Sequence, residues 1–197
     1  TIIATDANSG DLYYSNNLGK DWESATGLID IEHSLFEESF GIHIVEEATS
    51  NPMVLYAGYI QSKIKGQDPH QLDEIEQSPG MYKSIDGGMS WFPINNGLPD
   101  KEYSRNISDI AVSKQNENIV YINSLFDGLY YTVDGGESWN HLKGDLPAGL
   151  SWDDCGHTCV NEEGERIDME DMEPSEMILR KHAMSVAVNP QNDQEIF

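Results

Sequence analysis

Short runs of alternating apolar and polar residues recur along the chain, and a polar turn bounds each run. The runs come in pairs, at 41–45 and 53–57, at 107–112 and 119–122, and at 184–188 and 195–197. Such alternation is typical of a strand that is buried on one face. The pattern therefore predicts pairs of antiparallel strands that are joined by short turns.

A second pattern, Ser/Thr-x-Asp-x-Gly-x-x-Trp, occurs in full at 84–91 and 132–139 and in a degenerate form at 15–22. Each copy follows a short strand pattern rich in Tyr. Ser/Thr and Asp side chains can hydrogen-bond to turn backbone, Gly accepts a positive φ, and Trp can pack between neighbouring sheets. We therefore interpret the motif as a structural hairpin. Its positions are Ser15, Asn17, Gly19, Trp22, Ser84, Asp86, Gly88, Trp91, Thr132, Asp134, Gly136 and Trp139.

Together the two patterns give a repeating unit of four antiparallel strands, A to D, in which the motif joins strand C to strand D. Recurrence of such a unit is the signature of a β-propeller. The motif copies resemble the Asp-box, or BNR, repeat family, which includes sialidases, xyloglucan-hydrolysing glycosidases, photosystem assembly factors and sortilin/Vps10 propellers. The paired glycines after Asp86 and Asp134, with Leu98-Pro99 and Leu146-Pro147 nearby, are most similar to the sortilin-like and xyloglucanase-like group.

We expect an all-β fold, a β-propeller segment of four-stranded antiparallel blades with Asp-box hairpins. Its expected parts are a partial blade at 1–26, blades at 41–97 and 106–143, an acidic insertion at 144–181 and a partial blade at 182–197. Propellers usually close with about four to eight blades. We therefore expect a fragment of a larger propeller, with the remainder outside this chain. The alternative is that copies associate to close a ring, with the C-terminal A and B strands running into the N-terminal C and D strands.

The chain has 197 residues and a formal net charge of −24, from 35 acidic and 11 basic residues. This charge repels phosphate backbones, so we expect no nucleic-acid partner. The apolar runs fall far short of the roughly 20 residues that a membrane helix needs, so we expect no membrane insertion. High acidity keeps a surface hydrated. We expect a secreted, periplasmic or cell-surface protein, although no signal peptide is visible; an ordinary solvated surface is the alternative.

In this strand order, the A–B turns and the C–D hairpins share one end of the blades, and the B–C and D–A connections share the other. The short turns fall at the first end. The long connections, at 26–40, 61–79 and 144–181, all fall at the second end. Binding residues concentrate on long loops. We therefore expect a protein or carbohydrate ligand there; the alternative is that these insertions have no role.

The longest connection contains both cysteines. Cys155 and Cys159 are candidates for a disulfide in an oxidising compartment. Unpaired thiols, or a metal ion bound by both thiolates and His157, are the alternatives, but the spacing is not a standard zinc pattern. The carboxylates between 162 and 176 offer oxygen ligands for calcium without the spacing of an EF-hand, and we favour a solvated acidic loop. We therefore expect no cofactor, with calcium as the alternative.

Asp153 and Asp154, beside Trp152, are candidates for the two carboxylates that a glycosidase requires, although so acidic a chain supplies such pairs by chance. A sialidase grips its substrate carboxylate with arginines, and this chain has only Arg105, Arg166 and Arg180, none of them in the Arg-Ile-Pro context of sialidases. We expect a non-catalytic extracytoplasmic binding or scaffolding propeller, similar to sortilin-type Asp-box domains. A fragment of a xyloglucanase-like glycoside hydrolase is the alternative.

Overall fold

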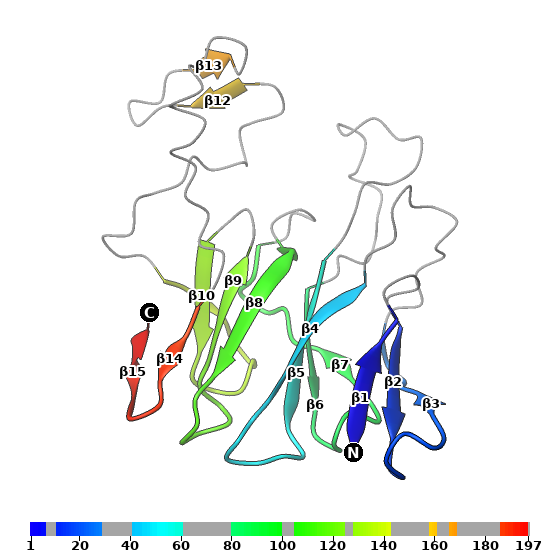
Figure 1. Ribbon diagram of the computed structural model, residues 1–197. Helices are drawn as coiled ribbons and strands as arrows, with labels where there is room; N and C mark the ends of the chain where they lie inside the picture. The colour runs from blue at the N-terminus through cyan, green and yellow to red at the C-terminus, as the bar shows by residue number, and fades with distance from the viewer. Residues whose placement is uncertain are drawn as a thin grey trace.

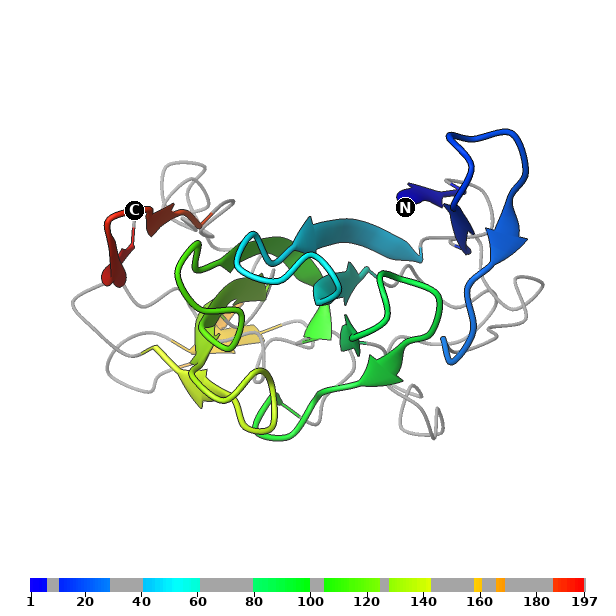
Figure 2. The ribbon, with the colours of Figure 1, turned by 90° about the horizontal axis from the view of Figure 1, so that it is seen from below.

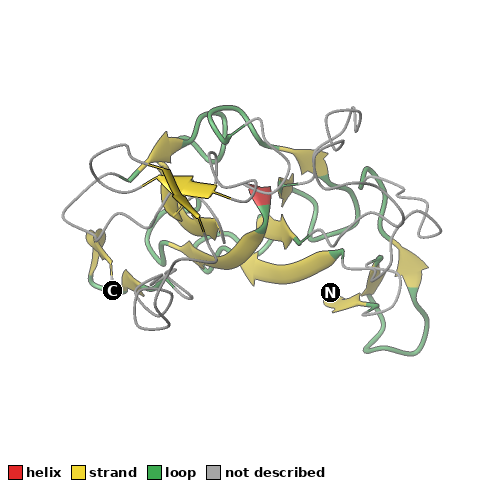
Figure 3. Ribbon diagram, turned by 90° about the horizontal axis from the view of Figure 1, so that it is seen from above, coloured by secondary structure: helices red, strands yellow, loops and turns green. Residues whose placement is uncertain are grey.

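The computed structural model describes residues 1–6, 11–28, 41–60, 80–99, 105–124, 128–142, 158–160, 166–168 and 186–196. These residues form strands and turns, with one short helical turn at Arg105 among them (Figure 3). Within these ranges, no helix has the length and hydropathy that a membrane crossing requires.

Four antiparallel sheets follow one another along the chain, and we name them blades I to IV. Blade I has the order β1-β2-β3, with β1 at Ile2–Thr5, β2 at Leu12–Ser15 and β3 at Glu23–Ser24. Blade II comprises β4 at Ile42–Glu47, β5 at Leu55–Tyr59, β6 at Met81–Ser84 and β7 at Phe92–Pro93.

Blade III repeats the order of blade II. It comprises β8 at Ile107–Val112, β9 at Val120–Ser124, β10 at Gly128–Thr132 and β11 at Asn140–His141. Blade IV is the hairpin of β14 at Val188–Asn189 and β15 at Asn192–Ile196. A further hairpin, β12 at Thr158–Val160 with β13 at Arg166–Asp168, lies within the expected acidic insertion.

The four blades stand side by side along an arc (Figure 1). In Figure 2, β4 and β8 run along the inner side of the arc, and β7 and β11 lie on its outer side. This is the arrangement of a β-propeller, in which the first strand of each blade lies nearest the axis. The prediction of an all-β propeller segment with four-stranded antiparallel blades is thus confirmed.

Blade I contains a strand that the sequence pattern does not predict. β1 pairs with β2 along its whole length, from Ile2 opposite Ser15 to Thr5 opposite Leu12. Because β5 pairs with β6 in the same way, β1 takes the second position of its blade. Blade I therefore has strands B, C and D, and the C-terminal hairpin supplies strands A and B. A ring in which those two strands run into the N-terminal C and D strands leaves no position for β1.

The hydrophobic core lies between successive blades. Each interface buries side chains from both of its blades: Leu12, Tyr82 and Trp91 between blades I and II; Tyr56, Ile94, Ile107 and Trp139 between II and III; Tyr121, Leu129 and Val186 between III and IV. A blade at the end of the row has a neighbour on one side only, so its other face is left uncovered within the described residues.

The innermost strands of blades II and III carry a β-bulge at the same position. In β4 the pairing with β5 skips His43, and in β8 the pairing with β9 skips Ser108. A bulge bends its strand and redirects the side chains around the extra residue. His43 and Ser108 therefore occupy equivalent places on the two innermost strands.

Candidate functional site

The motif turn of blade II uses its own polar groups. The Ser84 hydroxyl donates to Asp86 Oδ1 (2.8 Å) and accepts from the Gly88 N–H (2.9 Å). The Asp86 carboxylate accepts from the backbone N–H groups of Met89 and Ser90 (3.0 and 2.9 Å) and from the Ser90 hydroxyl (2.6 Å). Burial raises the pKa of Asp86, but these hydrogen bonds outweigh it and hold the pKa below its usual value.

The turn of blade III repeats this geometry. The Thr132 hydroxyl donates to Asp134 Oδ1 (2.6 Å) and accepts from the Gly136 N–H (3.0 Å). Ser138 donates both its hydroxyl (2.6 Å) and its backbone N–H (3.0 Å) to the Asp134 carboxylate. The hydroxyls of Ser138 and Thr132 stabilise the charged form most, and the pKa of Asp134 falls to about 2.

The degenerate turn of blade I keeps the same connections with a neutral amide. The Ser15 hydroxyl accepts from the Gly19 N–H (2.8 Å), and Asn17 Oδ1 accepts from the N–H groups of Lys20 and Asp21 (both 3.0 Å). Asn17 Nδ2 also donates to the Asp21 carboxylate (2.8 Å). A carboxylate is therefore not essential to the shape of the turn.

The tips of the motif turns meet the A–B turns of the same blade. The Gly87 N–H donates to the Met53 carbonyl, and the Gly135 N–H donates to the Asn118 carbonyl, both at 2.9 Å. These two glycines have φ values of 77° and 73°, whereas the equivalent residue in blade I is Leu18, with φ 62° and an exposed fraction of 89%. The C–D hairpins and the A–B turns thus share one end of the blades.

The motif tryptophans tie each blade to the one before it. The backbone N–H of Trp91 donates to the Thr26 carbonyl of blade I, and the backbone N–H of Trp139 donates to the Asn96 carbonyl of blade II, both at 2.9 Å. Both indoles are buried, at 3% and 4% exposure, whereas Trp22 is 43% exposed. Trp22 lies on the face of blade I against which no described blade packs.

Two glycines that the sequence analysis does not single out complete these contacts. Gly27 and Gly97 follow the accepting residues and have φ values of 81° and 90°. A Cβ added to Gly27 would lie 2.0 Å from the Trp91 carbonyl oxygen, and one added to Gly97 would lie 2.3 Å from that of Trp139. The signal in the sequence is a Thr/Asn-Gly-Leu triplet shortly after the motif, at 26–28 and 96–98.

The long connections leave blade II from the opposite end. The Gly41 carbonyl accepts from the Ile60 N–H (3.0 Å), and the Gly80 carbonyl accepts from the Tyr59 N–H (2.9 Å). The chain therefore enters blade II at Gly41, leaves it at Ile60 and returns to it at Gly80, all at the same end of the blade. Segments 29–40 and 61–79 themselves lie outside the described residues.

Most candidate residues of the longest connection lie outside the residues that the structure describes. Asp153, Asp154 and Cys155 lie outside the described residues. Cys159 lies in β12, for which the backbone pairing with β13 is described and the side chains are not. Over the described ranges, no group of three or more His, Cys, Asp or Glu side chains is placed to hold a metal ion. The disulfide and the carboxylate pair therefore stay predictions.

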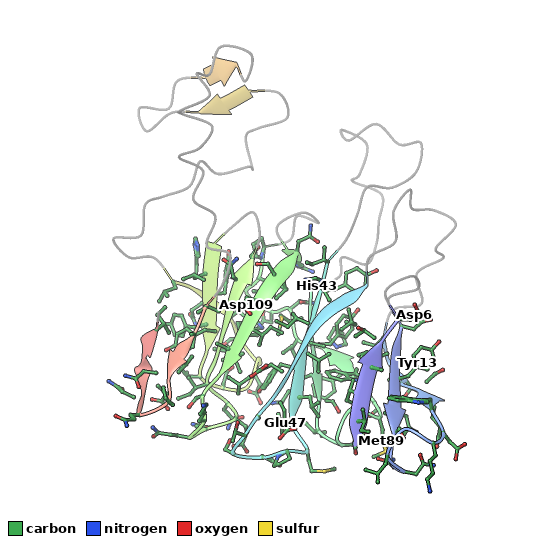
Figure 4. All side chains as sticks on the ribbon, viewed as in Figure 1. Asp6, Tyr13, His43, Glu47, Met89 and Asp109 are labelled. Carbon is green, nitrogen blue, oxygen red and sulfur yellow. The ribbon has the colours of Figure 1, made fainter. Side chains whose placement is uncertain are left out.

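An open groove of about 520 Å³ lies between β1 and the inner strands of blade II. Its lining comprises Thr1, Ile3 and Thr5 on one side, His43, Val45 and Glu47 on β4, and Pro52, Met53, Leu55 and Gly87 beyond β4. Figure 4 shows His43 and Glu47 toward opposite ends of β4. The groove thus has an apolar middle, formed by side chains such as Ile3, Val45 and Leu55, and polar groups at its ends.

This lining is unsuited to glycoside hydrolysis. Among the described residues that line the groove, Glu47 is the one carboxylate, and no Phe, Tyr or Trp side chain contributes. A glycosidase typically requires two carboxylates that flank the scissile bond.

Negative charge gathers on the innermost strands. Burial is the largest cause that raises the pKa of Glu46 on β4, and the charges of Asp109 and Glu47 add to it. The Asp109 carboxylate accepts from the Val186 N–H (2.7 Å). Asp109 therefore joins blade III to blade IV.

No family model and no curated protein matches the chain. Solved structures that resemble it include an ancestral GH74 enzyme, at 18% identity and a TM-score of 0.48 over 82% of this chain and 22% of that one. The GH74 xyloglucanase from Xanthomonas campestris gives 16% and 0.44, over 94% and 30%. YCF48 bound to D1 peptide gives 15% and 0.44, over 99% and 63%.

The chain therefore spans less than two thirds of each of these proteins. Such identities and TM-scores carry no argument about the site or its ligand. The propeller fold rests on the chain's own blades and on the contacts that repeat between them.

Proposed function

We propose that this chain is part of a non-catalytic Asp-box propeller of the sortilin-like kind that binds a protein or carbohydrate ligand outside the cytoplasm. The ligand binds at the end of the blades that carries segments 26–40, 61–79 and 144–181. The observation that carries the proposal is the use of the Asp86 and Asp134 carboxylates by their own turns. Because these two carboxylates serve their own turns, they are poor candidates for ligand contacts, which supports the opposite end of the blades as the binding surface.

Two features of the sequence support a location outside the cytoplasm. The net charge of −24 suits a hydrated surface. Cys155 and Cys159 can form a disulfide that stiffens the longest connection, and disulfides persist in oxidising compartments. The same segment is the candidate for the largest part of the ligand surface.

A xyloglucanase-like glycoside hydrolase is the second candidate. The pair Asp153 and Asp154 beside Trp152 favours it, because a carboxylate pair with a stacking platform is the chemistry that a glycosidase uses. Activity would require two carboxylates about 5 to 9.5 Å apart across the bound sugar. The described residues of the groove between β1 and β4 supply one carboxylate, Glu47, so this candidate function rests on Asp153 and Asp154.

The two functions separate in a binding and turnover experiment. Ligands are selected on the intact chain from a glycan array and from a phage-displayed library of linear peptides. Segments 29–40, 61–79 and 144–181 are each replaced in turn by a short Gly/Ser linker, and Thr26 and Gly27 are kept because they contact Trp91. For 61–79 a short linker suffices, since Tyr59 and Gly80 are hydrogen-bonded to each other. A control variant carries Ile85→Ser and Val133→Ser at the short-turn end, where both side chains are exposed.

The proposal predicts that at least one replacement abolishes binding of a selected ligand while the control variant retains it. Circular dichroism and the thermal midpoint show whether each variant is folded. Binding that survives all three replacements and is lost in the control variant would contradict the proposal. Release of reducing sugar from xyloglucan, lost in D153N or D154N, would establish the hydrolase instead.

A further inference from the structure

We infer that Asn96 is the site of a spontaneous covalent modification, the loss of its side-chain amide to the backbone nitrogen of Gly97, and that the packing of blade III against blade II restrains this reaction. The reaction is deamidation through a cyclic imide. It replaces a neutral amide with a carboxylate, and it can add a carbon to the main chain inside the contact that joins the two blades. The modification is a property of the blade interface and is independent of the ligand proposed above.

The pair Asn96-Gly97 is the one Asn-Gly pair in the sequence. Asparagine is among the chemically labile residues, and its amide is lost most readily when the next residue leaves its own backbone nitrogen open to approach. Glycine does so because it has no Cβ. Asn96 and Gly97 are both exposed, so water reaches them. The pair therefore has the groups that deamidation requires.

The reaction balances with water as its co-reactant. The Gly97 nitrogen forms a bond to Asn96 Cγ, the bond from Cγ to Nδ2 breaks, and Nδ2 leaves as ammonia with the Gly97 N–H proton. Water then opens the imide at one of its two carbonyls. Opening at Cγ leaves an ordinary aspartate. Opening at the main-chain carbonyl leaves an isoaspartate, in which the chain runs through the former side chain.

Contacts with blade III hold both the side chain and the main chain of Asn96. Asn96 Nδ2 donates to the Glu137 carbonyl, and the Asn96 carbonyl accepts from the backbone N–H of Trp139, both at 2.9 Å. The leaving group is thus hydrogen-bonded to the neighbouring blade. Attack at Cγ requires the side chain to leave Glu137 and to turn onto the nitrogen of Gly97.

The turn around the pair is fixed as well. The Leu98 N–H donates to the Asn95 carbonyl (3.0 Å), and Gly97 at the third position has φ 90°, as a type II turn requires. Gly97 also passes so close to blade III that an added Cβ would meet the carbonyl oxygen of Trp139. Rotation of the peptide between Asn96 and Gly97 therefore requires the interface to open.

The interface between blades I and II provides a natural comparison. There Thr26-Gly27 takes the place of Asn96-Gly97. The Thr26 carbonyl accepts from the backbone N–H of Trp91 (2.9 Å), and Gly27 has φ 81°. Threonine has no amide to lose, yet it makes the same main-chain contact. The contact with the tryptophan therefore does not require the amide at position 96.

An isoaspartate at position 96 does not fit the interface as it stands. The main-chain carbonyl that accepts from Trp139 becomes a free carboxylate, and the added carbon moves Gly97 out of its close fit. Because ammonia is lost, the change does not reverse when the blades close again. Deamidation of Asn96 therefore records past opening of the interface and weakens it.

The test follows conversion at Asn96 in the intact chain. The samples are the folded parent, the parent unfolded in guanidinium chloride, folded W139A and folded W22A, all incubated in mildly alkaline buffer made with heavy-oxygen water. Peptide mass spectrometry detects the labelled carboxylate, and Asn95 is the internal control because no glycine follows it. We expect conversion at Asn96 to be about tenfold or more slower in the folded than in the unfolded parent, faster in W139A than in the folded parent, and unchanged in W22A.

Equal conversion at Asn96 in the folded and unfolded parent would overturn the inference. Equal conversion of Asn95 and Asn96 in the unfolded chain would overturn it too, because position 96 would then not be a preferred site. Equal rates in folded W139A and W22A would show that blade III does not restrain the pair. If W139A does not fold, the comparison of folded and unfolded parent decides alone.

The effect on the interface is measured on converted chain that has been refolded. Two variants are its controls: N96D has the carboxylate without the added carbon, and N96T copies Thr26. We expect the isoaspartate form to melt about 4 °C or more below both. A thermal midpoint equal to that of N96D would mean that the interface tolerates the modification, which would contradict its proposed effect.

Discussion

The indole N–H of Trp139 donates a 2.6 Å hydrogen bond to the backbone carbonyl of Ile94, across the interface between blades II and III. Both residues are buried, at 4% and 8% exposure. The motif that builds a turn in one blade therefore also fixes that blade to its neighbour. The contribution of each motif copy to the free energy of unfolding should therefore depend on whether a neighbouring blade packs against its tryptophan.

Trp139→Ala should destabilise the chain far more than Trp22→Ala. The first change removes a buried indole and its hydrogen bond, at a cost of about 3 to 5 kcal/mol, whereas Trp22 is 43% exposed and its loss should cost less than about 1 kcal/mol. Urea denaturation of the two variants measures the difference. Equal losses of unfolding free energy would mean that the indoles do not act through the blade interface.

Leu18→Gly should stabilise the chain. Leu18 has φ 62° and is 89% exposed, so glycine relieves the strain of the left-handed region, worth about 1 kcal/mol, and loses little burial. The reverse change, Gly135→Leu, should destabilise, because Gly135 has φ 73° and a side chain there would displace Lys83 Nζ, which donates to the Gly135 carbonyl (2.9 Å). Thermal unfolding of both variants checks the pair. A lower thermal midpoint for L18G than for the parent would contradict the interpretation that Leu18 is strained.

Gly97→Ala should be costly, and Gly128→Ala is its matched control. The two glycines have φ values of 90° and 92°, so alanine is equally strained in both. A Cβ at Gly97 would lie 2.3 Å from the Trp139 carbonyl oxygen, but one at Gly128 would lie 3.6 Å from its nearest neighbour, His141 Nε2. We expect G97A to lose about 2 kcal/mol more than G128A. Similar denaturation midpoints for G97A and G128A would show that the close approach of Gly97 to Trp139 does not cause the loss of stability.

Stability should fall in acid through Asp134. Its pKa is lowered from 3.8 to about 2, so its contribution is present above pH 3.8 and is lost as the pH falls toward 2. Glu46 acts in the opposite direction, since its raised pKa favours the protonated form in the folded chain.

The matched variant is D134N, because Asn17 already builds the same turn without a charge. We expect D134N to remain folded and to lose less stability than the parent between pH 4 and pH 2, as measured by urea midpoints. A parallel pH dependence in the two proteins would show that Asp134 is not the titrating group.

The parts of the fold that depend on local sequence follow directly from the chain. The motif predicts the turn that it forms. Strand β8 covers the same residues, 107–112, that the alternation of apolar and polar positions predicts. β1 has four residues, too few to establish a period, and is recognisable only by its pairing with β2. The bulges at His43 and Ser108 depend on the register with a partner strand, which the pattern of a single strand does not contain.

The candidate site, like the fold, could be predicted from the sequence only in part. The motif residues are visible in the sequence, and the carboxylates of Asp86 and Asp134 hydrogen-bond within their own turns. The groove has no sequence signal, because Ile3 and Val45 come from different blades and meet only after the blades pack. The β12–β13 hairpin within 144–181 is also not predicted. The acidic run there masks the alternation of so short a pair.

The affinity of the D86N/D134N double variant for a ligand selected on the parent chain tests most directly whether the motif carboxylates serve structure alone. The comparison includes the three variants in which segments 29–40, 61–79 and 144–181 are replaced singly. We predict that the double variant binds with the parent's affinity, and that at least one segment replacement abolishes binding. Loss of binding in D86N/D134N while it is still folded, with binding retained in all three replacements, would contradict this account.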